Sequence, residues 1–207
     1  MKFDPKTHHR PFASAQGRRS IRLKGYDYRQ AGGYFVTLVT QGREMLFGEV
    51  VNGEMELNDF GKIVAETWQW LETQYPYVAL GEWTVMPNHF HGIIFILDDD
   101  GRGGSRTAPT NPQTVPTDPQ TVPANPQPIT DAVKRKPLGR LIGAFKTVST
   151  KHINVARHTE GTMVWQRNYY EHILRNETEL NRITRYIESN PARWADDNEN
   201  LSRKPNP

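Results

Sequence analysis

Three runs of hydrophobic residues have the length and composition of β-strands. Residues 32–41, GGYFVTLVTQ, are rich in β-branched and aromatic side chains. Residues 78–86 and 90–97 are further apolar runs separated by a Pro-Asn pair, which predicts two antiparallel neighbours. An Asn52-Gly53 pair between shorter apolar runs predicts a hairpin, because these residues favour a tight two-residue turn.

Three other segments repeat their hydrophobic residues with the period of an α-helix. The first runs from about residue 60 to 74 and follows an Asn-Asp pair that can cap it. The second, 138–156, has one apolar face and basic residues elsewhere, and the third follows Asn176. Between these two, MVWQRNYY predicts a short strand or extended segment. Helices and strands that mix in this order indicate an α+β domain.

The segment 98–133 interrupts this pattern. It starts with three acidic residues, contains seven prolines between Pro109 and Pro128, and has no aromatic residue. This composition predicts a disordered or polyproline-like insertion, because it cannot bury an apolar face. We therefore expect one domain formed by residues 32–97 and 134–194, flanked by a basic arm (1–31), this insertion and a polar C-terminal tail (195–207).

The net charge of +3 conceals an uneven distribution of charged residues. Residues 1–31 carry eight Lys and Arg against two acids, and residues 134–207 carry fourteen against eight, so each segment has a net charge of +6. Residues 32–133 carry four against thirteen, a net charge of −9. Two basic ends favour a polyanionic partner, and a globular protein with patchy surface charge is the alternative.

Composition excludes several classes of protein and site. The chain has no Cys, so any metal must be held by His, carboxylate or amide oxygen, and a cysteine nucleophile is excluded. No apolar run reaches the length of about 18 residues that a membrane span needs. The N-terminus lacks the apolar stretch of a secretory signal. We therefore expect a cytoplasmic protein without a membrane partner.

A His-x-His pair is the first candidate for chemistry. His89 and His91 flank Phe90 in a predicted strand, where residues two apart project from the same face and can reach one metal ion. An exposed pair of strand histidines is the simpler interpretation of this motif alone. Two imidazoles also suit Zn²⁺ or Ni²⁺, so the pair does not by itself identify the metal.

The last predicted helix adds a candidate nucleophile. Tyr186 and Asn190 are four residues apart and share a helical face, which places a phenol beside an amide oxygen. Near a bound metal ion, such a tyrosine can attack a phosphodiester while the metal polarises a phosphoryl oxygen. A tyrosine whose hydroxyl contacts only water is the alternative interpretation.

Four motifs together resemble the single-tyrosine HUH transposases, and most of all the REP-associated tyrosine transposases. These motifs are MPNHFHGII, LGRLIGAFKTVSTKHIN, VWQRNYYEHILRN and RYIESNP, and they occur in the order that the family has. The resemblance covers residues 32–97 and 134–194. It leaves out the basic arm and the proline-rich insertion.

The resemblance implies a fold and a catalytic site. The fold is an RRM-like or ferredoxin-like antiparallel sheet of four to five strands with helices on one face. The histidine pair lies on a central strand of this sheet, and the tyrosine lies on a C-terminal helix. In this chain, His89 and His91 would bind Mg²⁺ or Mn²⁺, Asn190 would be a third ligand, and Tyr186 would be the nucleophile.

The resemblance also implies a reaction and a partner. Family members cut single-stranded DNA near a hairpin and form a 5′-phosphotyrosine with a free 3′-OH, as transposases or as domesticated relatives. We therefore expect a nucleoid-associated protein that acts as a monomer or homodimer. Basic residues of the arm and of two helices are the candidate DNA contacts: Arg18, Arg19, Arg22, Lys24, Lys146, Lys151, Arg182 and Arg185.

Three functions remain open at the level of sequence. The first is a metal-dependent DNA strand transferase. The second is a non-catalytic DNA-binding protein derived from a transposase. The third is a metallohydrolase that uses water as its nucleophile, in which Tyr186 is incidental. A covalent protein–DNA adduct separates the first function from the other two.

Overall fold

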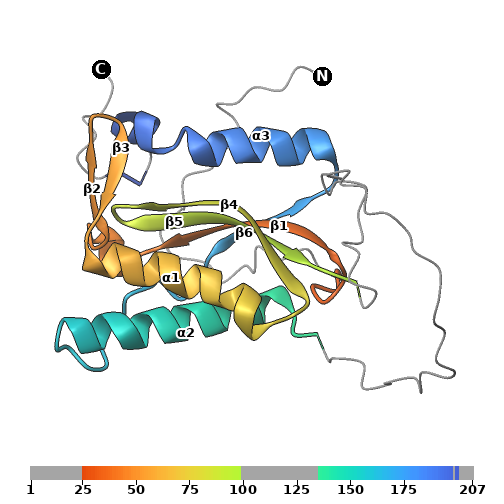
Figure 1. Ribbon diagram of the computed structural model, residues 1–207, viewed down its shortest axis with the longest axis horizontal. Coiled ribbons are helices and arrows are strands. Elements are labelled where there is room, and N and C mark those ends of the chain that lie inside the picture. The colour runs from red at the N-terminus through yellow and green to blue at the C-terminus, as the bar shows by residue number, and fades with distance from the viewer. Residues whose placement is uncertain (1–24, 99–134, 198, 201–207) are drawn as a thin grey trace, which may run out of the picture.

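The computed structural model describes residues 25–98, 135–197 and 199–200, and its centre is a four-stranded antiparallel sheet (Figure 1). The strand order is β4-β5-β1-β6. The sheet thus has β5 as a central strand, as the resemblance implied. The strands are β1 (Gly32–Val39), β4 (Val78–Met86), β5 (His89–Ile96) and β6 (Tyr170–Leu174).

Three helices cover the two faces of this sheet. The helices α1 (Asp59–Gln74) and α2 (Leu138–Ala156) lie on one face, and α3 (Glu177–Glu188) lies on the other (Figure 1). The expectation of helices on one face therefore holds for α1 and α2 but not for α3. The central strands are apolar on both faces, so a third layer is needed to cover the second face. Among the residues that the structure describes, no helix combines the length and apolar character that crossing a membrane requires.

Each face of the sheet has its own hydrophobic core. The larger core lies between the sheet and the α1–α2 layer, and Trp68, Phe90 and Phe145 pack at its centre. The smaller core seats α3 on the opposite face through five buried residues: Phe35, Ile93, Leu174, Ile183 and Ile187. Tyr186 packs at the edge of this smaller core, so apolar burial fixes the position of the tyrosine helix.

The turn and helix-start predictions from the sequence are confirmed. Asn58 caps α1 by accepting a hydrogen bond from the Gly61 amide, and Asn176 caps α3 in the same way. The hairpin of β2 (Gly48–Val51) and β3 (Glu54–Leu57) turns at the Asn-Gly pair. Both turn residues have positive φ, 53° and 82°, which the mirror-image hairpin turns require.

Two segments differ in detail from the sequence expectation. Trp165 forms a single bridge with Thr40, and the regular strand β6 starts only at Tyr170. Tyr26 and Tyr28, which composition placed in the basic arm, are half-buried and pack on the larger core. Those two tyrosines therefore belong to the domain. The predicted disordered insertion and the arm up to residue 24 lie outside the described residues.

The described residues on either side of the proline-rich segment contact each other. Arg135 Nη1 donates to the Leu97 carbonyl at 3.0 Å and lies 3.4 Å from an Asp98 carboxylate oxygen. A short Gly/Ser loop in place of residues 101–130 can therefore join the ends without straining the sheet. Because loop-closure entropy changes only slowly with length, we expect the free energy of unfolding to change by less than about 1 kcal/mol. Chemical denaturation measures this, and a larger loss of stability would show that the segment is structural.

Candidate active site

The two histidines of the motif are buried side by side on β5. Their side chains project toward α3, and the exposed fraction is 0% for His89 and 3% for His91. The ring centroids are 4.6 Å apart. The shared face that the His-x-His spacing predicts is therefore confirmed, whereas the interpretation as an exposed pair is wrong.

Hydrogen bonds at Nδ1 orient both imidazoles. His89 Nδ1 lies 3.0 Å from Asn88 Oδ1, and His91 Nδ1 lies 2.8 Å from the hydroxyl of Thr37. Thr37 is the register partner of His91 on β1, so the sheet itself places this hydroxyl. With Nδ1 held by these partners, Nε2 of each ring faces the site, as is typical of metal-binding histidines.

Tyr186 brings its hydroxyl to the same site from α3. The phenol oxygen lies 3.3 Å from His91 Nε2, and the two rings pack edge-to-face at 5.2 Å. Phe35 contacts both rings from the smaller core. Burial, with the charge of Asp197 as a smaller contribution, raises the pKa of Tyr186 to about 12. Without a bound cation or DNA, the Tyr186 phenol is therefore protonated at neutral pH.

Two buried polar atoms in this site lack a hydrogen bond of good geometry within the described part of the chain. They are Nε2 of His89 and Oδ1 of Asn190, which follows α3 and is 3% exposed. The Asn190 side chain interacts with both His89 and Tyr186. A buried acceptor without a partner destabilises a fold by roughly 1–3 kcal/mol, and a bound cation would satisfy both atoms.

Asp197 is a further candidate ligand that the sequence analysis missed. One of its carboxylate oxygens and a ring nitrogen of each histidine lie within 4.8 Å of one another. The sequence analysis assigned this residue to the polar tail. After α3, however, the short helix η2 (Pro191–Asp196) leads the chain back toward β5, and the Trp194 ring lies 5.9 Å from the His89 ring. Pro191, the first residue of η2, is the sequence feature that could have predicted a new helical turn here, because proline is common at the first position of a helix.

The donor set fits a divalent cation. Burial lowers the pKa of His89 to about 4, so the imidazole is neutral at pH 7, which is the form that binds metal. Imidazole nitrogen with amide and carboxylate oxygen suits Mn²⁺ and related first-row ions, and the oxygen ligands suit Mg²⁺. The residues present therefore fit the metal that the resemblance implies.

The predicted basic residues fall on opposite sides of the molecule. Arg182 and Arg185 are exposed on α3, and Arg182 is one turn before Tyr186. Lys146 and Lys151 lie on α2, across the sheet. The Lys146 ammonium already donates to the carbonyls of residues 166 and 168, at 2.8 and 3.1 Å. The four arginine and lysine candidates of the arm lie outside the described residues.

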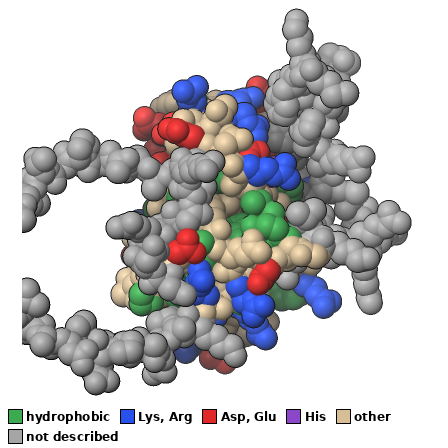
Figure 2. Space-filling model, turned by 90° about the vertical axis from the view of Figure 1, so that its right-hand side faces the viewer, with side chains coloured by type: hydrophobic (Ala, Val, Ile, Leu, Met, Phe, Trp, Pro, Cys, Tyr) green, Lys and Arg blue, Asp and Glu red, His purple; other side chains and the backbone are tan. Residues whose placement is uncertain are grey.

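The end of the molecule that carries the start of α3 shows a mixed surface. Lys and Arg side chains surround a small hydrophobic patch there, with acidic side chains between them (Figure 2). Tyr170 on the edge strand β6 is 39% exposed, and its pKa is raised mainly by partial burial, with Arg182 acting against that rise. Tyr169 points to the opposite face and packs on the larger core. Of these neighbouring tyrosines, Tyr170 is the one available to an external ligand.

The fold of this domain is similar to that of a transposase of known structure. Its fold matches the solved structure of a REP-associated tyrosine transposase bound to a REP hairpin, with a TM-score of 0.51 and 15% identity over 87% of this chain and 80% of that chain. No family model matches the sequence.

A protein relative extends this comparison to the sequence. An uncharacterized protein of Haemophilus influenzae is 36% identical over 185 residues, which covers 89% of this chain and 94% of the relative. The chain therefore belongs to the same family as this Haemophilus protein. The family relationship comes from the sequence identity, and the transposase likeness is one of fold.

Proposed function

We propose that the protein cleaves single-stranded DNA near hairpins and transfers the strand through a 5′-phosphotyrosine on Tyr186, as a transposase or a domesticated relative. The observation that carries this proposal is the site itself. The Tyr186 hydroxyl lies 3.3 Å from His91 Nε2, beside two buried atoms, His89 Nε2 and Asn190 Oδ1, that lack a well-formed hydrogen bond among the described residues. The transposase of similar fold was bound to a REP hairpin, which supports a DNA hairpin as partner.

The residues of the site divide into ligands and a nucleophile. His89, His91 and Asn190 would hold Mg²⁺ or Mn²⁺, and Asp197 adds a carboxylate oxygen within reach. When bound, the ion supplies polarisation of a phosphoryl oxygen. The buried Ile183 and Ile187 hold α3 on the sheet and thereby fix the tyrosine oxygen for in-line attack.

The reaction needs no energy source besides the DNA. The Tyr186 oxygen forms a bond to phosphorus as the bond between phosphorus and the 3′-oxygen breaks. The phenol loses a proton, and the leaving 3′-oxygen gains one to become the 3′-OH. The phosphotyrosine keeps the bond energy of the phosphodiester, so the reverse attack by a 3′-OH can rejoin DNA. The protein would act as a monomer, and a homodimer is the alternative. Such a protein would be associated with the nucleoid in the cytoplasm.

The two other functions are less well supported. A non-catalytic DNA-binding descendant does not need a tyrosine hydroxyl at a buried histidine pair, and its site would tolerate loss of these residues. A metallohydrolase that uses water does not need Tyr186, yet α3 delivers this phenol to His91. The site geometry therefore favours tyrosine-mediated transfer.

The test is a covalent adduct. The protein is incubated with a single-stranded oligonucleotide that contains a hairpin, with Mn²⁺ or with EDTA, and is run on a denaturing gel. We expect a DNA-linked band with Mn²⁺ and none with EDTA. Cleavage without any adduct would support the hydrolase, and binding without cleavage would support the non-catalytic protein.

Arg182 should contribute more to DNA binding than Lys151. A strand that reaches Tyr186 passes the α3 face, where Arg182 is exposed one helical turn away, whereas Lys151 lies across the sheet. We expect Arg182→Ala to weaken binding of the hairpin oligonucleotide and to reduce the slope of log K against log salt by about 0.7. Lys151→Ala, the matched control, should change both quantities less. Fluorescence anisotropy at several salt concentrations measures both, and a larger effect at Lys151 would place the strand on the α2 face.

A further inference from the structure

We propose that Asn88 is a positioning residue: its amide fixes the tautomer of His89 and ties the segment that carries Asp197 to the histidine strand. The inference rests on the metal site in the proposed function and goes further by assigning a role to a residue that would not itself bind the ion. Asn88 lies in the turn between β4 and β5 and is fully buried.

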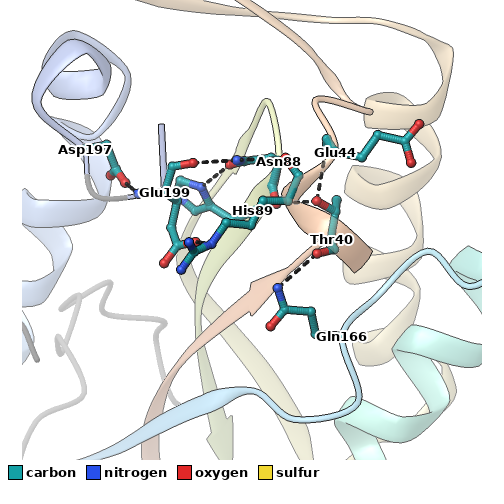
Figure 3. Close-up of polar contacts among 8 residues, drawn as sticks. Thr40, Glu44, Asn88, His89, Gln166, Asp197 and Glu199 are labelled. Carbon is teal, nitrogen blue, oxygen red and sulfur yellow. Dashed lines mark hydrogen bonds and ion pairs between the residues drawn. The ribbon is translucent and has the colours of Figure 1, made fainter. Parts of the chain in front are cut away.

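Both the nitrogen and the oxygen of the Asn88 side-chain amide form hydrogen bonds. The amide nitrogen donates to the Glu199 carbonyl at 2.6 Å and to the Arg43 carbonyl at 3.3 Å (Figure 3). Because carbonyl oxygens only accept, these two contacts identify the nitrogen end of the amide. The oxygen end therefore faces His89 Nδ1, at 3.0 Å.

This orientation determines the form of His89. The amide oxygen of Asn88 accepts a hydrogen bond, so Nδ1 of His89 must carry the proton and Nε2 must carry the lone pair. In the other tautomer, two acceptors would face each other in a buried place. The lone pair on Nε2 is the feature that a cation needs, and this atom is the one without a partner in the described residues.

The backbone around Asn88 is held as firmly as its side chain. Its carbonyl accepts from the amide and the hydroxyl of Thr40, at 2.9 and 3.0 Å (Figure 3). The carbonyl of Thr40 in turn accepts from the Gln166 side chain at 3.1 Å. The amide of Asn88 therefore extends from a fixed turn and has little freedom to rotate away from His89.

The same amide connects to the C-terminal segment. Glu199, whose carbonyl accepts from Asn88, is two residues after Asp197, and its carboxylate forms an ion pair with Arg43 at 2.7 Å. One side chain thus contacts His89 on one side and the segment of Asp197 on the other (Figure 3). Loss of the amide should disturb both potential ligands together.

Two substitutions separate positioning from a purely structural role. Asn88→Ala removes the acceptor for His89 and both donated hydrogen bonds. Asn88→Asp keeps an acceptor oxygen for His89 but loses the two donated bonds. Asn154→Ala is the matched control, because Asn154 is a buried asparagine on α2 that donates to the Thr162 carbonyl at 2.8 Å, across the sheet from the site.

The first readout is the His89 tautomer in the metal-free protein. Long-range ¹H–¹⁵N correlation spectra report which ring nitrogen is protonated, and comparison with His89→Ala assigns the signal. We expect Nδ1–H in the wild type, in Asn88→Asp and in Asn154→Ala. We expect a mixture of tautomers, or the Nε2–H form, in Asn88→Ala.

The second readout is Mn²⁺ affinity without DNA, measured by electron paramagnetic resonance. Loss of a residue that orients a ligand typically weakens metal binding by about 10–100-fold, and we expect a loss in this range for Asn88→Ala and none for Asn154→Ala. Affinity is not compared for Asn88→Asp, because its added charge also attracts the ion.

Several results would overturn the role of Asn88. They are an unchanged His89 tautomer and Mn²⁺ affinity in Asn88→Ala, or loss of the Nδ1–H form in Asn88→Asp. If Asn88→Ala does not fold, the tautomer in Asn88→Asp decides alone. Neither readout uses DNA, so a protein that forms no covalent adduct but shows these changes would contradict the proposed function and leave the role of Asn88 intact.

Discussion

Tyr186→Phe should abolish the covalent protein–DNA adduct and leave DNA affinity within about two-fold of the wild type. The substitution removes only the phenol oxygen and keeps the ring that packs on Phe35 and His91. Because the lost oxygen is the proposed nucleophile, the rate of adduct formation should fall by at least about 10³-fold. Single-turnover assays on a radiolabelled hairpin oligonucleotide measure the rate, and anisotropy measures the affinity.

Tyr170→Phe and Tyr169→Phe are the matched controls. The Tyr170 ring lies 6.2 Å from the Phe35 ring, and Tyr169 lies on the opposite face of the sheet. Neither hydroxyl has the place beside His91 Nε2 that Tyr186 has. Both variants should still form the adduct, and mass spectrometry of the wild-type adduct should find the nucleotide on Tyr186. A nucleotide on Tyr170 or Tyr169 would refute the assignment of the nucleophile.

The sequence predicts the elements of this fold better than their layering. Apolar periodicity identifies the helices and most strands, and the caps Asn58 and Asn176 mark two helix starts where the structure has them. Periodicity does not say which face of the sheet a helix covers. The third helix lies apart from the other two because alternate residues of β1, such as Phe35, are also apolar and need cover.

The candidate site was also only partly predictable. A spacing of two residues in a strand gives the shared face of His89 and His91, and a spacing of four in a helix gives the neighbours Tyr186 and Asn190. Both spacings lie within a single strand or helix, so they determine which side chains share a face whatever the rest of the fold is. Asp197 is distant in sequence from the histidines and reaches them only through the turn at η2, so no local spacing contains it.

Charge proved a weaker guide than spacing. Lys146 belongs to a basic helix and was a candidate DNA contact. Its ammonium, however, donates hydrogen bonds to three backbone carbonyls of the segment before β6. Burial lowers the pKa of Lys146 to about 8, as expected for an ammonium group drawn away from water. A basic residue can therefore complete the fold instead of contacting a polyanion, and composition does not distinguish these roles. Lys146 remains a proposed DNA contact, one that would have to share its ammonium with these carbonyls.

His89→Ala and His91→Ala should each abolish DNA cleavage and weaken Mn²⁺ binding by at least about 100-fold, because each removes an imidazole from the proposed ligand set. Both side chains are buried, so each substitution should also destabilise the fold. The Asn88 side-chain oxygen loses its histidine partner in His89→Ala, and the Thr37 hydroxyl loses its own in His91→Ala. Each loss should lower the free energy of unfolding by about 1–3 kcal/mol. Isothermal titration with Mn²⁺ and urea denaturation measure the two effects separately.

His172→Ala distinguishes loss of a ligand from loss of stability. His172 lies on β6 and pairs with Glu179 of α3 at 2.6 Å, so its removal should also destabilise the fold by loosening the tyrosine helix. It is not part of the cluster of potential ligands, and Mn²⁺ affinity should therefore stay within about two-fold of the wild type. If all three variants lost Mn²⁺ affinity in proportion to their stability, binding would depend on the fold as a whole. Full cleavage activity in a variant that lacks both His89 and His91 would refute the metal site, because no other histidine belongs to the described cluster.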